Sequence, residues 1–164
     1  MQAERSSHPQ PPPDPSAPEQ AIFRHSFSAD PLSVRAALHS TLARFVRQMT
    51  KDEAGALEIV LAEVFNNIVR HGYGNSGKGT ITLALARDRR GLTCLVCDDG
   101  IELPERCLSG IGGDHPRPVP DTLPEGGFGW FLIRDLVEDL HYCRHDGRNE
   151  LVFRLPLAPL ALAQ

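Results

Sequence analysis

The sequence has no long uninterrupted run of apolar residues. A helix that crosses a bilayer needs about 18 to 20 of them, and no stretch of this chain approaches that length. The first residues also lack the apolar segment of a secretory signal peptide. We therefore expect a cytoplasmic protein that has no membrane partner.

An excess of positive charge is missing as well. The 17 Lys and Arg residues are outnumbered by 21 Asp and Glu residues, which gives a formal net charge of −4. Nucleic acid is bound through basic surfaces, so this composition argues against direct nucleic-acid binding.

Cysteine is scarce, with four residues in the chain. Cys94 and Cys97 form a C-x-x-C pair, but they fall in an expected strand, where residues three apart point to opposite faces. Cys107 falls in a loop and Cys143 near another expected strand. This distribution favours reduced structural thiols over a zinc or redox pair.

Proline and glycine, with 14 residues each, are frequent and unevenly distributed. Six prolines lie among polar residues in 1–20, so we expect a disordered or polyproline-like tail there. Five more prolines and three glycines interrupt residues 101–125, and a connection of that length is typical of a functional lid or a disordered segment. The rest predicts one folded domain over 21–157 and a C-terminal tail over 158–164.

Hydrophobic periodicity predicts both strands and helices, and hence an α/β domain. Two helix starts are marked by capping residues, at Asp30-Pro31 and in the capping box from Thr50 to Glu53. The expected elements are a strand over 21–29, helices over 30–49 and 50–71, a hairpin over 79–87 and 92–97, a helix over 128–138, and a final hairpin over 140–144 and 150–155.

Three polar side chains recur at intervals of four on the second expected helix, at Glu63, Asn67 and His71. They form a slanting stripe that can face one ligand, although a solvated helix face has the same pattern. An amide oxygen suits Mg²⁺ that also binds phosphate, so Asn67 is a candidate metal ligand. Glu63 is a candidate base for phosphoryl transfer. His71 is a candidate phosphate contact, with Arg70 as the alternative cation.

Two further motifs follow along the chain. Asp98 ends an apolar strand and could accept a hydrogen bond from the amino group of adenine, while Gly100 would let the backbone approach the base. An Asp-Asp-Gly hairpin turn is the alternative interpretation. Gly126, Gly127 and Gly129 open a helix, where amide groups and the helix dipole favour phosphate, although a loop exit is also commonly rich in glycine. Together the motifs indicate a Mg-nucleotide pocket.

In this order, segments 63–74, 98–100 and 126–133 resemble the N box and the two glycine boxes of the GHKL ATPase superfamily, and within it the anti-sigma-factor serine kinases. The similarity covers about 22–155. It implies a Bergerat-type α+β two-layer sandwich, with helices on one face of a mixed, mostly antiparallel sheet. It also implies that ATP and Mg²⁺ lie between the N-box helix and the lid over 101–125.

The resemblance also implies a function. Sensor histidine kinases usually carry Asn where this chain has Glu63, and a Glu there suits an acceptor that brings no base, such as serine. We therefore expect an ATP-dependent serine protein kinase that switches partners. It would phosphorylate a small anti-sigma-factor antagonist, with a sigma factor as a second candidate partner, and it would form a homodimer.

A non-catalytic module that sequesters a protein partner is the alternative to this kinase function.

Two positions depart from the family pattern. Ile101-Glu102 stands where the first glycine box commonly continues with glycine, and Phe128 stands where a basic or polar residue is common.

Overall fold

The computed structural model describes residues 23–104, 107 and 128–159. The predicted N-terminal tail, Gly126, Gly127 and most of the predicted lid lie outside these residues. The elements, in chain order, are β1 (Phe23–Ser28), α1 (Pro31–Phe45), η1 (Val46–Gln48), α2 (Lys51–Asn67), η2 (Ile68–Gly72), β2 (Thr80–Asp88), β3 (Gly91–Asp98), α4 (Phe128–Leu136), β4 (Glu138–His145) and β5 (Arg148–Pro156).

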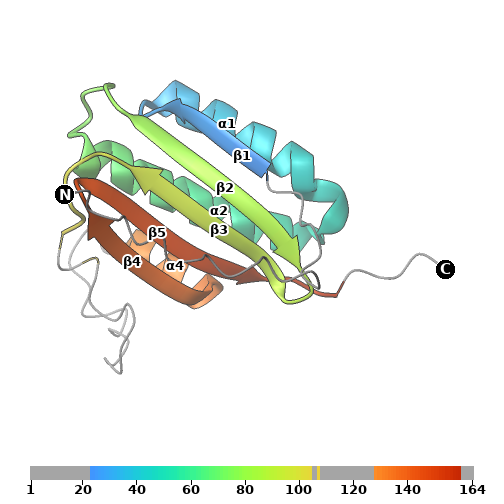
Figure 1. Cartoon of the computed structure of the whole chain (residues 1–164). Coiled ribbons are helices and arrows are strands. Elements are labelled where there is room, and N and C mark those ends of the chain that lie inside the picture. The colour runs from blue at the N-terminus through green and yellow to red at the C-terminus, as the bar shows by residue number, and fades with distance from the viewer. Residues whose placement is uncertain (1–22, 105–106, 108–127, 160–164) are drawn as a thin grey trace, which may run out of the picture.

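The strands form a five-stranded sheet in the order β1-β2-β3-β5-β4, and each described pairing is antiparallel. The helices α1, α2 and α4 cover one face of this sheet (Figure 1). The expected α+β two-layer sandwich is therefore confirmed. No helix among the described residues is both long enough and apolar enough to span a membrane.

Local sequence signals start the two long helices. The Asp30 side chain accepts a hydrogen bond from the Ser33 backbone N–H at 2.9 Å and so caps α1. Thr50 and Glu53 form the predicted capping box of α2. Each cap satisfies a backbone donor that would otherwise lack a partner, and is worth about 1 kcal/mol.

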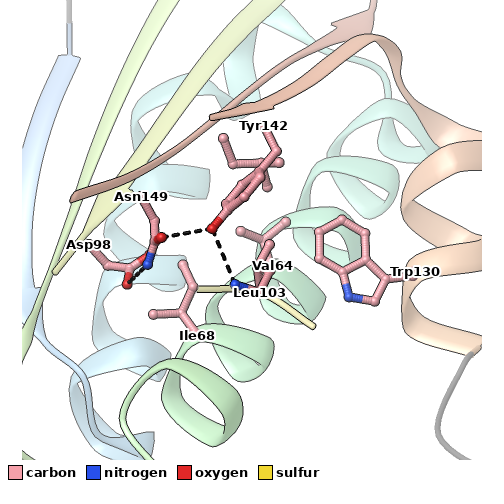
Figure 2. Close-up of a pocket in the computed structure, with 8 residues that line it drawn as sticks. Val64, Ile68, Asp98, Leu103, Trp130, Tyr142 and Asn149 are labelled. Atoms are coloured by element: carbon pink, nitrogen blue, oxygen red, sulfur yellow. Dashed lines mark hydrogen bonds between the residues drawn. The ribbon is translucent and has the colours of Figure 1, made fainter. Parts of the chain in front are cut away.

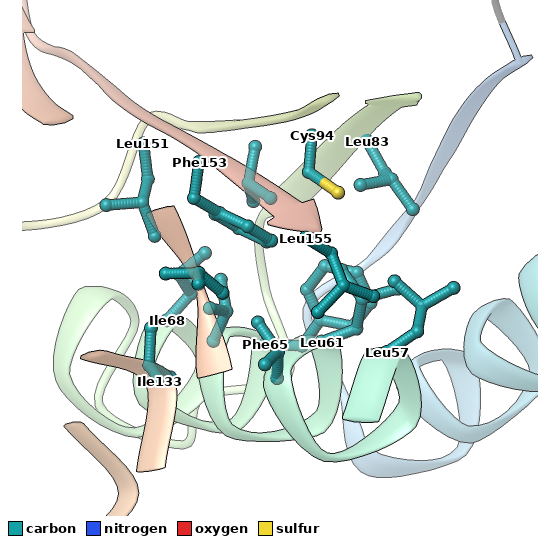
Figure 3. Close-up of a cluster of buried hydrophobic side chains, with 14 of the residues drawn as sticks. Leu57, Leu61, Phe65, Ile68, Leu83, Cys94, Ile133, Leu151, Phe153 and Leu155 are labelled. Atoms are coloured by element: carbon teal, nitrogen blue, oxygen red, sulfur yellow. The ribbon is translucent and has the colours of Figure 1, made fainter. Parts of the chain in front are cut away.

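The core lies between the sheet and the helices. Alternate residues of each central strand point towards the helices, so a row of buried apolar side chains crosses the sheet at Leu85, Cys94 and Phe153. From the other layer, α2 contributes a stripe of buried side chains with the helical repeat. Figure 3 shows this cluster, which includes Leu57, Leu61, Phe65, Ile68, Leu83, Ile133, Leu151 and Leu155.

The end of α2 differs from the prediction. The α-helix ends at Asn67, and the chain continues as a π-helical turn over Ile68–Gly72, whereas the periodicity predicted one helix to His71. A π turn is wider than an α turn. An interval of four residues therefore no longer keeps His71 in line with Glu63 and Asn67.

Candidate functional site

The first turn of α4 lies directly against Glu63 of α2. A Cβ atom added at Gly129 would overlap the Glu63 carboxylate oxygen Oε2, so a larger residue here would displace the carboxylate. The carboxylate thus lies beside the N-terminal turn of α4, where the helix dipole favours negative charge. Two of the predicted motifs meet at this contact.

Asn67 lies one helical turn after Glu63, and its side chain is almost fully buried, with 8% of its surface exposed. Its Nδ2 atom has no hydrogen-bond partner among the described residues. Buried polar groups normally have partners, and rotation of this amide can present either its oxygen or its NH₂ group. Asn67 therefore fits the predicted role of a ligand to Mg²⁺, which would take its remaining ligands from phosphate and water.

Asp98 ends β3 and is 7% exposed. Its Oδ1 atom accepts hydrogen bonds from the Gly100 backbone N–H at 2.8 Å and from Asn149 Nδ2 at 2.9 Å. Burial raises the pKa of the Asp98 carboxyl, and both hydrogen bonds oppose that shift because they stabilise the charged form.

The first glycine motif packs on the end of η2. A Cβ atom at Gly100 would lie 2.6 Å from the Gly72 carbonyl oxygen, so this close approach requires glycine. The Ile101 backbone N–H donates to the same carbonyl at 2.8 Å, and the Asp99 N–H donates to the Tyr73 hydroxyl at 3.0 Å. These bonds hold the ends of η2 and β3 together.

Beside Asp98 lies a small cavity between α2, α4 and the sheet. Figure 2 shows its lining residues, which are Val64, Ile68, Asp98, Leu103, Trp130, Tyr142, Asn149 and Leu151. A mostly apolar slot with polar groups at one end suits a planar base. The space open to the centre of a water molecule is only about 10 Å³, which is room for roughly one water. A purine would therefore have to displace side chains in order to enter.

Only some of the predicted site residues line this cavity. Asp98 lines it, whereas Glu63, Asn67 and His71 do not. Val64 of α2 and Ile68 of η2 do line it, and they directly follow Glu63 and Asn67 in sequence. Of these two polar residues, Glu63 lies against Gly129 of α4. The structure places His71 in η2, and its phosphate contact stays a prediction.

Asn149, Tyr142 and Trp130 are site residues that the sequence analysis did not identify. Asn149 falls in the turn expected between the strands over 140–144 and 150–155, yet it is 3% exposed and pairs with Asp98 across β3 and β5. A signal was available, because Asn149 lies in the same alternating phase as the apolar residues Leu151 and Phe153, which marks it as inward-facing.

The sequence matches the family described as "Histidine kinase-like ATPase domain" over residues 27–155. It is 33% identical over 104 residues to a protein named serine-protein kinase RsbW from Bacillus mycoides (strain KBAB4), covering 62% of this chain and 63% of that protein. It is 26% identical over 105 residues to a protein named anti-sigma F factor from Bacillus licheniformis, covering 61% of this chain and 68% of that protein.

The chain thus spans a little under two thirds of the first of these relatives, 63% of its length. The family match covers more of the chain than these relatives do. Residues 27–155 include every described helix and strand except the start of β1 and the last residue of β5. A domain of this family implies ATP binding. This match shows that the chain belongs to the histidine kinase-like ATPase domain family.

Proposed function

We propose that this protein is an ATP-dependent serine protein kinase that acts in an anti-sigma-type partner switch. One observation carries the proposal: the Glu63 carboxylate lies against Gly129 at the start of α4, next to the cavity that Asp98 lines. This contact supports a base and a phosphate-binding helix start near the cavity, which side chains would have to open for a purine to enter. The names of the relatives, a serine-protein kinase and an anti-sigma factor, support this choice of activity.

Each residue has a role that its position allows. Asp98 would accept a hydrogen bond from the adenine amino group, and the first turn of α4 would bind phosphate oxygens through its amide groups. Asn67 would hold Mg²⁺ through its amide oxygen. Bound ATP would supply the phosphoryl group that is transferred, and Mg²⁺ would offset the negative charge of the phosphates. Glu63 would orient the acceptor serine hydroxyl and take its proton.

The partners follow from the same proposal. The phosphoacceptor would be a serine on a small anti-sigma-factor antagonist, and a sigma factor would be the competing partner. Neither Gly126 nor Gly127 lies within the described residues, so their predicted phosphate contacts remain predictions, as does the homodimer.

The test is transfer of labelled γ-phosphate from ATP to a purified small anti-sigma-factor antagonist. We expect phosphoserine in the antagonist with the wild type, and a fall of at least about a hundredfold in rate with Glu63→Gln, which keeps the size of the side chain but removes the base. Glu58→Gln is the matched control, because Glu58 is exposed on the same helix. Equal rates in the two variants would contradict the role of Glu63.

A non-catalytic binding module is the second candidate. The small size of the cavity beside Asp98 favours it, because a base cannot enter without movement of side chains. Under this alternative, Glu63→Gln would leave capture of the protein partner unchanged, and the wild type would show no phosphoryl transfer.

A further inference from the structure

We propose that Asn149 is a positioning residue of the nucleotide site, which holds the Asp98 carboxylate in the orientation that selects a purine carrying a 6-amino group. This inference rests on the proposed ATP binding and deepens it. Asn149 acts through Asp98 and the adjoining backbone, so it is assigned no direct part in phosphoryl transfer.

The amide nitrogen of Asn149 binds the end of β3 at three points. Nδ2 donates to Asp98 Oδ1 at 2.9 Å and to the Gly100 and Ile101 carbonyls, each at 3.2 Å, so one of its two N–H groups is shared between two acceptors. Asp98 and Gly100 come just before the predicted lid over 101–125, and Ile101 is its first residue. One side chain of β5 therefore fixes both the carboxylate and the start of the following loop.

The amide oxygen of Asn149 is held as firmly from the other side. Oδ1 accepts from the Tyr142 hydroxyl at 2.7 Å and from Arg144 Nη1 at 2.6 Å, both on β4. Because two groups donate hydrogen bonds to this oxygen, the NH₂ group must face Asp98. Exchanging the positions of the amide oxygen and nitrogen would lose the bonds from Tyr142 and Arg144. Figure 2 shows the chain of bonds from Leu103 through Tyr142 and Asn149 to Asp98.

This network controls what Asp98 can recognise. Gly100 and Asn149 both donate to Oδ1, so the carboxylate is fixed in rotation and is stabilised as an anion despite its burial. A fixed, ionised carboxylate accepts hydrogen bonds only. It therefore favours a 6-amino purine, which donates at that position, over a 6-oxo purine, which presents an oxygen there.

Other charges near Asp98 act on the same carboxyl group. Asp99 raises its pKa, and Arg144 lowers it. The hydroxyls of Tyr73, after η2, and Tyr142, on β4, face it as neutral groups with raised pKa values of their own. Loss of Asn149 removes a hydrogen bond that holds the carboxyl in its charged form, so the pKa of Asp98 is expected to rise further.

The experiment compares the affinities of the full chain for ATP and for ITP, its 6-oxo analogue, in the wild type and in Asn149→Ala. We expect the preference for ATP to fall about tenfold, which is the effect of weakening one charged hydrogen bond. Thr41→Ala is the control, because Thr41 is a buried polar residue on α1, hydrogen-bonded to the Ala37 carbonyl and remote from the site. It should leave the ATP to ITP ratio unchanged.

Two further variants cover the case in which Asn149→Ala does not fold. Asn149→Ser keeps a donor for Asp98 and should recover part of the preference for ATP. Tyr142→Phe removes one of the two donors to Asn149 Oδ1 and keeps the ring, so a smaller fall, of roughly twofold to threefold, is expected. In the nucleotide-free protein, a carboxyl ¹³C NMR titration of Asp98 should show a higher pKa in Asn149→Ala, or in Tyr142→Phe, than in the wild type.

The outcomes separate this inference from the proposed function. An unchanged ratio together with an unchanged pKa of Asp98, in folded variants, would overturn the role of Asn149 while leaving ATP binding in place. Equal affinity of the wild type for ATP and ITP would do the same. A wild type that binds neither nucleotide would contradict the proposed function and this inference with it.

Discussion

Polar side chains buried in the described part of the chain are few, and most of them belong to one place. Four polar or charged residues are buried there, and three of them, Asn67, Asp98 and Asn149, lie at the candidate site. Burying a polar group costs free energy unless it is hydrogen-bonded. Asp98 and Asn149 bond to each other, whereas Asn67 Nδ2 has no partner among the described residues. The unmet N–H donor of Asn67 would suit a phosphate oxygen, and rotation of the amide would turn its oxygen to a metal ion in the same place.

Asn67→Ala tests this interpretation in the absence of nucleotide. A buried amide with an unmet hydrogen bond costs about 1–3 kcal/mol, and its removal offsets the packing that is lost. We therefore expect the free energy of unfolding to change by less than about 1 kcal/mol, as measured by urea denaturation. A loss of several kcal/mol would mean that Asn67 already has a structural partner.

Asp98→Asn tests the electrostatics of the buried carboxyl. Burial raises the pKa of Asp98 above its ordinary value of 3.8. For a raised pKa, the contribution to stability is present below the unfolded pKa and is lost as the pH rises through the folded pKa. We expect the free energy of unfolding of the wild type to fall relative to Asp98→Asn as the pH rises above 3.8, in melts at several pH values. A difference that is independent of pH would contradict this expectation.

At two places, a glycine lets two elements of the structure pack closely together. Gly129 lets α4 approach Glu63 of α2, and Gly100 lets the loop after β3 approach Gly72. Gly55, in contrast, lies within α2 with no atom near the position of an added Cβ. The first two glycines join motifs that are distant in sequence, and the third is a helix residue with no such contact.

Gly129→Ala and Gly55→Ala form a matched pair. The first should push the Glu63 carboxylate aside and slow phosphoryl transfer, while the free energy of unfolding changes little because that carboxylate is the movable end of its side chain. The second should stabilise the protein by roughly 0.5–1 kcal/mol, because alanine favours the helix. Thermal denaturation and phosphoryl-transfer rates of both variants check this. Equal effects would show that Gly129 makes no special contact.

Sequence alone predicted the features that depend on local chemistry. The caps at Asp30 and Thr50 are formed by residues three positions apart, and the strands follow from alternation, so both could be predicted and are confirmed. The π-helical turn after Asn67 could not be predicted in this way. Its end is held by Gly72 and Tyr73 bonding to the chain after β3, which is distant in sequence.

The candidate site was predicted in part, for a similar reason. Asp98 and Gly129 were predicted because their motifs are short and ordered along the chain, and Asp98 and Trp130, the residue after Gly129, line one cavity. The role of Asn149 depends on the pairing of β3 with β5, which sets it opposite Asp98. A hairpin-turn motif carries no information about that pairing, so Asn149 was interpreted only as a turn residue.

For the molecule as a whole, the central claim is that α2, β3 and α4 together form a Mg-ATP site. Each of these three elements contributes a side chain or an amide group to the proposed site, and the elements are about thirty residues apart in sequence. The chain has a single tryptophan, Trp130, which lines the cavity beside Asp98. Its fluorescence therefore reports on this cavity directly.

The most direct measurement is a titration of Trp130 fluorescence with Mg-ATP in the wild type, Asn67→Ala and Asn66→Ala. Asn66 is exposed on the same helix and serves as the control. We expect a saturable change in the wild type and in Asn66→Ala, with affinity about tenfold weaker in Asn67→Ala because a metal ligand is lost. No change in the wild type at millimolar nucleotide, together with no thermal stabilisation, would contradict the proposed site.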